Sequence, residues 1–181
     1  MKNILNFIVL AFLLCLSSCA IGPGHNAVKV PDGDSVILVG TTGFEALEEA
    51  PFSDWYTSGY GTFTADSSQT EVLTPLLEEV DIVVFMGTWC EDSHREIPKF
   101  VRILEATGYP IEAIEVIAMT RDKTTPQEYE AGQNITNIPT FIFSKDGEEL
   151  GRIVEFPVEN LESDMLKILS GQPYKHAYDW D

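Results

Sequence analysis

Residues 81–100 read DIVVFMGTWCEDSHREIPKF, and this stretch decides the fold. Its first six residues form an apolar run, which predicts a buried β-strand. A charged segment with helical periodicity follows Cys90, so we expect a tight turn and then a helix that begins at this cysteine. Unpaired N–H groups and the positive end of the dipole at a helix N-terminus both favour thiolate over thiol. Cys90 is therefore the candidate nucleophile, because the thiolate is the reactive form of cysteine.

The first 18 residues are expected to be a signal peptide rather than part of the fold. Lys2 gives a basic start, and residues 4–16 form an apolar run that is too short for a comfortable transmembrane helix. Small residues precede Cys19, and this pattern resembles the bacterial lipobox. The resemblance implies cleavage before Cys19, lipidation of its thiol and an extracytoplasmic location, anchored to the cell membrane or the outer membrane on the periplasmic side. The alternative is an ordinary signal peptide that is cut shortly after this cysteine.

The net charge of −18 is the most restrictive feature of the composition. Such acidity excludes nucleic acid as a partner and excludes electrostatic attachment to anionic lipid, so membrane contact is expected only through the lipid on Cys19. With Cys15 removed and Cys19 lipidated, Cys90 is the one free thiol and no internal disulfide forms. The sequence contains no cluster of metal ligands and no phosphate-binding loop, so we expect neither a metal nor a cofactor.

The chain after the signal peptide is expected to form one domain, residues 35–171. Residues 19–34 contain glycine and proline without a clear pattern, which predicts a tether. Residues 172–181 are expected to be a short, frayed tail. Apolar runs and turn signals predict five strands, the last two joined by an Asp-Gly hairpin turn. These strands are expected at residues 35–40, 81–86, 114–119, 140–143 and 149–156.

The helical predictions rest on apolar residues at spacings of three and four. The helix that begins after Cys90 carries such a stripe and is expected to end at Gly108. Residues 44–63 are rich in aromatic side chains, which we expect to pack in the core rather than to form a ligand platform. Further helices are expected after a capping box of Ser68 and Glu71, over residues 125–133, and over residues 158–169.

Three groups of residues together resemble the bacterial thioredoxin-like family, in particular its membrane-anchored thiol-disulfide oxidoreductases. They are Trp89-Cys90-x-x-Ser93, then Arg95, Glu96 and Pro98, and downstream Ile138-Pro139-Thr140. The resemblance implies an α/β thioredoxin-like fold, a central mixed β-sheet flanked by helices, with an added N-terminal strand and aromatic-rich segment. It also implies that Trp89 and Ser93 frame the nucleophile. The last three residues would form a substrate groove in which a cis-proline faces the cysteine.

Two departures from the family pattern limit the chemistry that can be carried over. Ser93 stands where a dithiol reductase has the second cysteine that resolves its mixed disulfide. Val84 stands where thioredoxins carry a buried aspartate that serves proton transfer. We therefore expect monothiol exchange with protein disulfides or thiols, in which N–H groups of residues 91–93 and the Ser93 hydroxyl stabilise the sulfur anion. Release then requires a thiol of the substrate, a small thiol or a recycling oxidoreductase.

Two other functions remain open on the sequence alone. In the first, the groove beside Pro139 holds an extended peptide by β-augmentation without turnover. In the second, oxidation of Cys90 to a sulfenic acid makes the protein a redox sensor.

Several charged residues near the motif have two interpretations. His94 is either a base for Cys90 or a solvated helix residue. Arg121 and Arg152 are possible contacts for an anion. Three basic residues of the helix are expected to pair with acidic neighbours on a solvated face. They are Arg95, Lys99 and Arg102, with Glu91, Glu96 and Glu105 as the expected partners.

Overall fold

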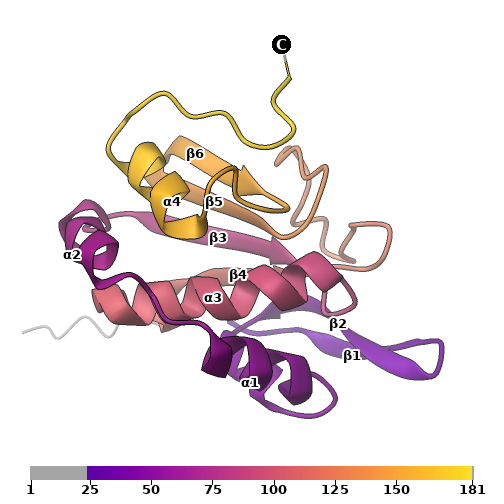
Figure 1. Cartoon of the computed structure of the whole chain (residues 1–181). Helices are drawn as coiled ribbons and strands as arrows, with labels where there is room; N and C mark the ends of the chain where they lie inside the picture. Colours follow the sequence, from indigo (N-terminus) through magenta and orange to yellow (C-terminus); the bar gives the residue numbers. More distant parts are fainter. Residues whose placement is uncertain (1–23, 181) are drawn as a thin grey trace, which may run out of the picture.

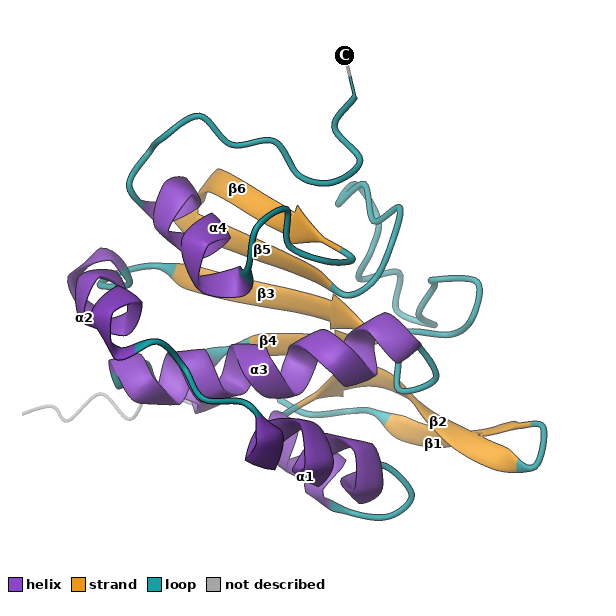
Figure 2. Cartoon of the chain, viewed as in Figure 1, coloured by secondary structure: helices purple, strands orange, loops and turns teal. Residues whose placement is uncertain are grey.

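The computed structural model describes residues 24–180, and the predicted signal peptide and Cys19 lie outside this range. The described chain forms a six-stranded sheet in the order β1-β2-β4-β3-β5-β6 (Figure 1, Figure 2). The strands are β1 (Val28–Asp32), β2 (Ser35–Thr42), β3 (Asp81–Met86), β4 (Glu115–Ala118), β5 (Thr140–Lys145) and β6 (Glu148–Val154). The helices are η1 (Phe44–Glu48), α1 (Ser53–Thr62), α2 (Ser67–Leu76), α3 (Glu91–Thr107), η2 (Ile111–Ala113) and α4 (Leu161–Leu169).

The unit that places the candidate nucleophile is β3, α3 and β4. β3 pairs in parallel with β4, with Phe85 opposite Ile117, and α3 is the crossover between them. The other neighbouring strands pair antiparallel. The predicted α/β fold with a central mixed sheet is therefore confirmed. Within residues 24–180, no helix is both long enough and apolar enough to cross a bilayer.

All four α-helices cover the same face of the sheet, as Figure 1 shows. Val84 and Met86 of β3 point toward this face and share one buried cluster with side chains from each of the four helices. The predicted apolar stripe of α3 lies in this cluster, and Phe100 sits at its centre with its ring centroid 4.4 Å from that of Phe141. Fully burying a side chain of this size contributes about 1.5–3 kcal/mol to stability, so this face supplies most of the hydrophobic stabilisation.

The opposite face of the sheet is covered by a loop instead of a helix. Phe85 and Ile117 lie in a smaller buried cluster there, against Tyr129 of the segment that joins β4 to β5. The helix predicted over residues 125–133 is wrong, because this stretch is a series of turns. Glu128 has a positive φ of 57°, and the Glu130 carboxylate accepts hydrogen bonds from the N–H and hydroxyl of Thr125. These local bonds compete with the helical pattern of backbone hydrogen bonds.

The segment predicted as a tether belongs partly to the fold. β1 lies within it and pairs with β2 along the edge of the sheet, so the prediction for residues 19–34 is wrong from residue 28 onward. Asn26 fastens the start of this hairpin: its N–H donates to the Thr41 carbonyl at 2.9 Å, and its Oδ1 accepts from the Thr41 N–H at 2.9 Å. A Cβ at Gly40 would lie 2.6 Å from that Oδ1, which only glycine avoids.

The aromatic-rich segment folds into η1 and α1, and its packing role is confirmed. Phe44, Phe52 and Tyr56 are buried in the cluster on the helix-covered face. No clear helical pattern marks α1 in the sequence, because it contains two glycines and lacks a strong apolar stripe.

The start of α2 and the C-terminal tail both differ from the predictions. α2 is capped by Asp66, whose carboxylate accepts from the Ser68 N–H at 2.8 Å, so the predicted capping box of Ser68 and Glu71 is wrong. The tail is held to the domain at Tyr174 rather than frayed from Gln172 onward, and its end at Trp180 is exposed. The Tyr174 hydroxyl donates to the buried Asp164 carboxylate at 2.9 Å. Burial and this carboxylate both raise the pKa of Tyr174.

Candidate functional site

Cys90 occupies the turn between β3 and α3, as predicted. It is the N-cap residue of α3, its N–H donates to the Gly87 carbonyl at 3.0 Å, and its carbonyl accepts from the His94 N–H at 3.0 Å. The backbone there is extended, so the side chain leaves the helix axis and its thiol is half-buried. Among residues 24–180 this is the one cysteine, and it is not in a disulfide.

Gly87 is a site residue whose role the sequence did not reveal. A Cβ at this position would lie 2.8 Å from Ile138 Cδ1 and 2.8 Å from the Trp89 ring. Real side chains do not approach so closely, so only glycine lets these two groups close over the turn. Trp89 is held in that position by a hydrogen bond from its Nε1–H to the Met119 carbonyl at 2.9 Å.

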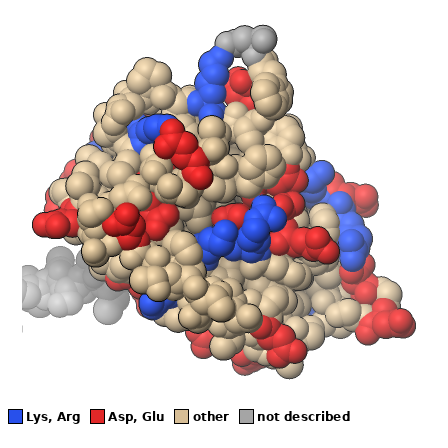
Figure 3. All heavy atoms as spheres, in the orientation of Figure 1, with Lys and Arg blue, Asp and Glu red and all other residues tan. Residues whose placement is uncertain are grey.

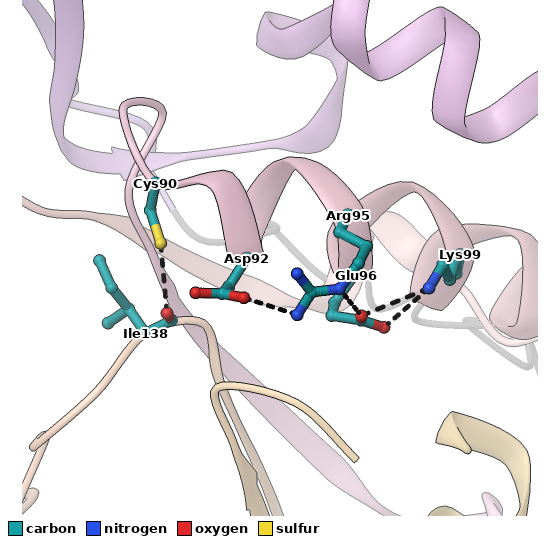
Figure 4. A network of polar contacts seen from close by, with 6 residues as sticks. All are labelled: Cys90, Asp92, Arg95, Glu96, Lys99 and Ile138. Atoms are coloured by element: carbon teal, nitrogen blue, oxygen red, sulfur yellow. Dashed lines mark hydrogen bonds and ion pairs between the residues drawn. The ribbon is translucent and has the colours of Figure 1, made fainter.

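The loop before β5 approaches the thiol from the other side. The Ile138–Pro139 peptide bond is cis, as predicted, and the Cys90 Sγ donates to the Ile138 carbonyl at 3.4 Å (Figure 4). The side chains of Ile138 and Thr140 are buried, and the Thr140 hydroxyl donates to the Asn137 carbonyl at 2.6 Å. Of the predicted groove residues, Ile138 therefore lies against Cys90 through its backbone carbonyl, and Thr140 holds the loop in shape without lining the cleft.

Ser93 is fully buried beneath the turn. Its hydroxyl accepts from the Gly87 N–H at 3.2 Å. Within residues 24–180 this hydroxyl bonds to the backbone and not to the Cys90 sulfur, in contrast to the expected contact with the sulfur anion. Ser93 therefore stabilises the turn, because this bond joins Gly87 at the start of the turn to the first turn of α3.

A cleft of about 400 Å³ opens beside the thiol. Four of its lining residues were not predicted as members of one site, because they come from three separate loops: Arg121, Lys123, Asn137 and Glu155. Arg121 lies with its guanidinium carbon 5.1 Å from the Trp89 ring centroid and forms a two-pronged ion pair with Asp32 at 2.8 and 2.9 Å. This hydrogen-bonded pairing lowers the pKa of the Asp32 carboxyl.

Comparison with known proteins identifies the family. Residues 52–166 match the family model described as thioredoxin, which covers more than half of the chain and includes Cys90 and Pro139. The chain belongs to the thioredoxin family. No protein with a curated description matches it.

Two solved structures are also similar to parts of this chain. A Pseudomonas aeruginosa protein of unknown function is 16% identical, with a TM-score of 0.56 over 72% of this chain and 93% of that protein. Mitochondrial thioredoxin 3 from Saccharomyces cerevisiae, in its oxidised form, is 22% identical over 53% of this chain and 86% of that one, with a TM-score of 0.32. At 16% identity, the likeness to the Pseudomonas aeruginosa protein concerns the fold and not the reaction.

In this thioredoxin-family chain, His94 is neither solvated nor directed at the thiol. Its ring stacks on Trp55 of α1 with centroids 4.2 Å apart, and its Nε2 lies 2.8 Å from the Thr88 carbonyl. A carbonyl accepts, so Nε2 carries the proton and donates. The ring therefore fastens α1 to the turn before Cys90.

The basic residues of α3 are paired along the helix, as Figure 4 shows. Arg95 contacts Asp92 and Glu96, each at 2.6 Å, and Lys99 contacts the buried Glu96 at 3.3 Å. The predicted pairing with Glu96 and Glu105 is confirmed, and Asp92 replaces Glu91 as a partner. The predicted solvated face is wrong at Glu96, because its side chain is buried. In the space-filling view, basic side chains (blue) lie next to acidic ones (red) on this face, so no basic patch is free of acidic neighbours there (Figure 3).

Arg152, named above as a possible contact for an anion, is already paired. Arg152 is engaged by Glu149 and by the Gln133 carbonyl at 2.7 Å, away from the cleft at Cys90. In residues 24–180, no group of histidine, cysteine, aspartate and glutamate side chains is arranged to hold a metal ion.

Proposed function

We propose that this thioredoxin-family protein performs monothiol exchange through Cys90. The observation that carries the proposal is the half-buried thiol at the N-terminus of α3, which opens into a cleft and faces the Ile138 carbonyl beside the cis-proline Pro139. The free N–H groups of the first helical turn are positioned to stabilise a sulfur anion.

The reaction follows from the single thiol. The Cys90 thiolate attacks one sulfur of a partner disulfide, which forms a mixed disulfide with Cys90 and releases the second partner sulfur as a thiolate. An external thiol then attacks the Cys90 sulfur, which frees the reduced partner and leaves the external thiol bound to Cys90. A second external thiol releases Cys90, so two thiols are oxidised to one disulfide for each partner disulfide reduced.

The external thiol is required because Ser93 cannot act as a resolving group. Its oxygen is fully buried and bonded to the Gly87 N–H, and an alcohol does not replace a thiolate in disulfide exchange. The co-reactant is a small thiol, a thiol of the substrate or another oxidoreductase.

The proposed location is outside the cytoplasm, with the protein held to a membrane by lipid on Cys19. The support is the lipobox-like sequence before Cys19 and the acidic surface, which disfavours attachment to anionic lipid by charge. Fractionation tests it: the wild type should stay with membranes in high salt, and Cys19→Ala should not.

The exchange reaction is tested with bis(2-hydroxyethyl) disulfide and peptide mapping by mass spectrometry. The folded wild type should gain one hydroxyethylthio group on Cys90, faster than the same chain unfolded in urea, and Cys90→Ser should gain none at that peptide. A folded rate that does not exceed the unfolded rate would overturn the proposal and favour a peptide-binding module.

A matched variant tests the role of Ser93. Ser93→Cys should form an internal disulfide with Cys90 and reduce insulin catalytically in the presence of dithiothreitol, whereas the wild type should not. Equal activity in the two proteins would mean that the missing second sulfur does not limit turnover.

A further inference from the structure

A second hollow lies at the opposite end of α3 from the thiol. It has a volume of about 390 Å³ and is bounded by η1, α1, the last turns of α3 and η2. Glu105 of its wall is fifteen residues beyond Cys90 along the helix, which corresponds to about 22 Å at 1.5 Å per residue. The hollow is therefore independent of the cleft at Cys90, and its size falls within the range of small-molecule sites.

Four carboxylates line this hollow, and they lack matching positive charge. Glu48 and Glu112 form no ion pair with any residue in the range 24–180. Among residues 24–180 the ion partner of Glu45 is a histidine, His25, at 3.1 Å. Glu105 lies 3.8 Å from Arg102, and its carboxylate also accepts a hydrogen bond from the Tyr60 hydroxyl. One guanidinium and one imidazole thus face four acidic groups, and a concave site with low-dielectric walls concentrates this negative potential.

Tyr56 supplies an independent sign that a ligand belongs here. Its side chain is 5% exposed and forms part of the wall of the hollow. None of the residues from 24 to 180 makes a hydrogen bond with its hydroxyl, and the oxygen is not sealed from solvent, so it is open to a partner in the hollow. Burial, with added repulsion from Glu48 and Glu105, raises the pKa of Tyr56. The phenol therefore stays protonated, and its oxygen is free to accept a hydrogen bond.

The arrangement of the walls defines the class of ligand. The carboxylates do not converge on one point as metal ligands do, so more than one separated positive charge suits them better than a single ion. Phe44, Ile111 and Ile114 contribute apolar surface between the carboxylates. A ligand that fits has ammonium groups at its ends and methylene groups between them.

We propose that this hollow binds a linear aliphatic diamine or polyamine. One ammonium group donates to the Tyr56 hydroxyl oxygen and to the Glu48 and Glu105 carboxylates. A second ammonium group reaches Glu112, and the methylene chain lies against the apolar wall. This site does not depend on the proposed chemistry at Cys90.

The test is isothermal titration of the purified chain with putrescine at physiological ionic strength. Putrescine should bind with one site per chain and at least about tenfold more tightly than butylamine, which carries one charge on the same four carbons. Magnesium chloride should compete weakly. Equal affinity for butylamine, displacement by magnesium at equal concentration, or binding of many putrescine molecules per chain would overturn the proposal.

Variants distinguish specific binding in the hollow from non-specific attraction of a cation to an acidic protein. Glu48→Gln/Glu112→Gln should weaken putrescine binding about tenfold or more. The matched control Glu71→Gln/Glu148→Gln removes the same charge from exposed positions outside the hollow and should change the affinity less than about twofold. Tyr56→Phe keeps the buried ring, removes only the hydroxyl, and should weaken binding about three- to tenfold. Equal losses in the two double variants, or an unchanged affinity in Tyr56→Phe, would contradict the proposed site.

Discussion

The two faces of the sheet are built differently, and the difference explains where the chemistry lies. On one face, side chains from four helices join a large buried cluster. On the other, a small cluster around Phe85 is covered by the loop between β4 and β5. Trp89 and Cys90 pack against the second cluster. The helix-covered face therefore provides stability, and the loop-covered face leaves the thiol partly open to a partner.

The largest effect is expected from truncating one large side chain on each face. Phe100→Ala should lower the free energy of unfolding by about 3–5 kcal/mol, because α3 and the sheet are too rigid to fill the cavity. Phe85→Ala should cost at least about 1 kcal/mol less, since the loop over it can collapse into the space. Urea denaturation measures both. Equal costs would show that the two faces are equally rigid, and the exposed substitution Val72→Ala serves as the control.

An intermediate effect is expected from Gly87→Ala, which acts only on the face that carries the thiol. The added methyl group must displace Ile138 or the Trp89 ring, at a cost of about 1–3 kcal/mol for an overpacked site. The rate of Cys90 modification should change as well, because these two groups border the cleft. Putrescine binding should not change. A variant with wild-type stability and wild-type thiol reactivity would contradict the tight contact at this turn.

The smallest effect is expected from Thr125→Val, and it should depend on pH. Burial raises the pKa of Glu130, but hydrogen bonds from Thr125 outweigh burial, so the pKa lies below its usual value. The stabilisation is therefore present above the usual glutamate pKa of about 4.3 and is lost as pH falls through the lower pKa of the folded state. Thr125→Val should cost about 1 kcal/mol at neutral pH and less in acid.

Unfolding in urea at pH 7 and at pH 3 measures this dependence. Glu130→Gln is the control, because a glutamine amide does not titrate. The free energy of unfolding of this variant should therefore depend less on pH than that of the wild type. A cost of Thr125→Val that is the same at both pH values would mean that the charged carboxylate is not the partner that matters.

The parts of the fold that were predicted correctly have strong local patterns. The apolar run of β3, the stripe of α3 and the Asp146-Gly147 turn each specify one structure over a few residues. The segment over residues 125–133 was predicted wrongly, because the hydrogen bonds of Thr125 and Glu130 override a weak helical pattern. β1 was missed because Pro31 interrupts a short run of alternating apolar and polar residues that begins at Val28, and an edge strand tolerates a proline that a central strand would not.

The residues at the candidate site also divide into those that a motif predicted and those that no sequence pattern indicated. Cys90 and the cis-proline were placed by their motifs, and the structure brings Cys90 to the carbonyl of Ile138, the residue before Pro139. Arg121 and Glu155 line the cleft but follow different strands, and no spacing in the sequence relates them. The partner of the Ser93 hydroxyl was also not predictable, because it depends on how closely the turn at Gly87 approaches α3.

If Cys19 carries the proposed lipid, the hydrogen bonds that hold Gly24 and Asn26 to Thr41 limit how far the domain can lie from a membrane. Gly24 is then only five residues beyond the anchor, and this stretch spans at most about 18 Å. A tether reaching to Asp34 would have spanned about 50 Å. The domain would therefore work within a shallow layer next to the bilayer, where its targets would be neighbouring membrane proteins and chains emerging from the membrane.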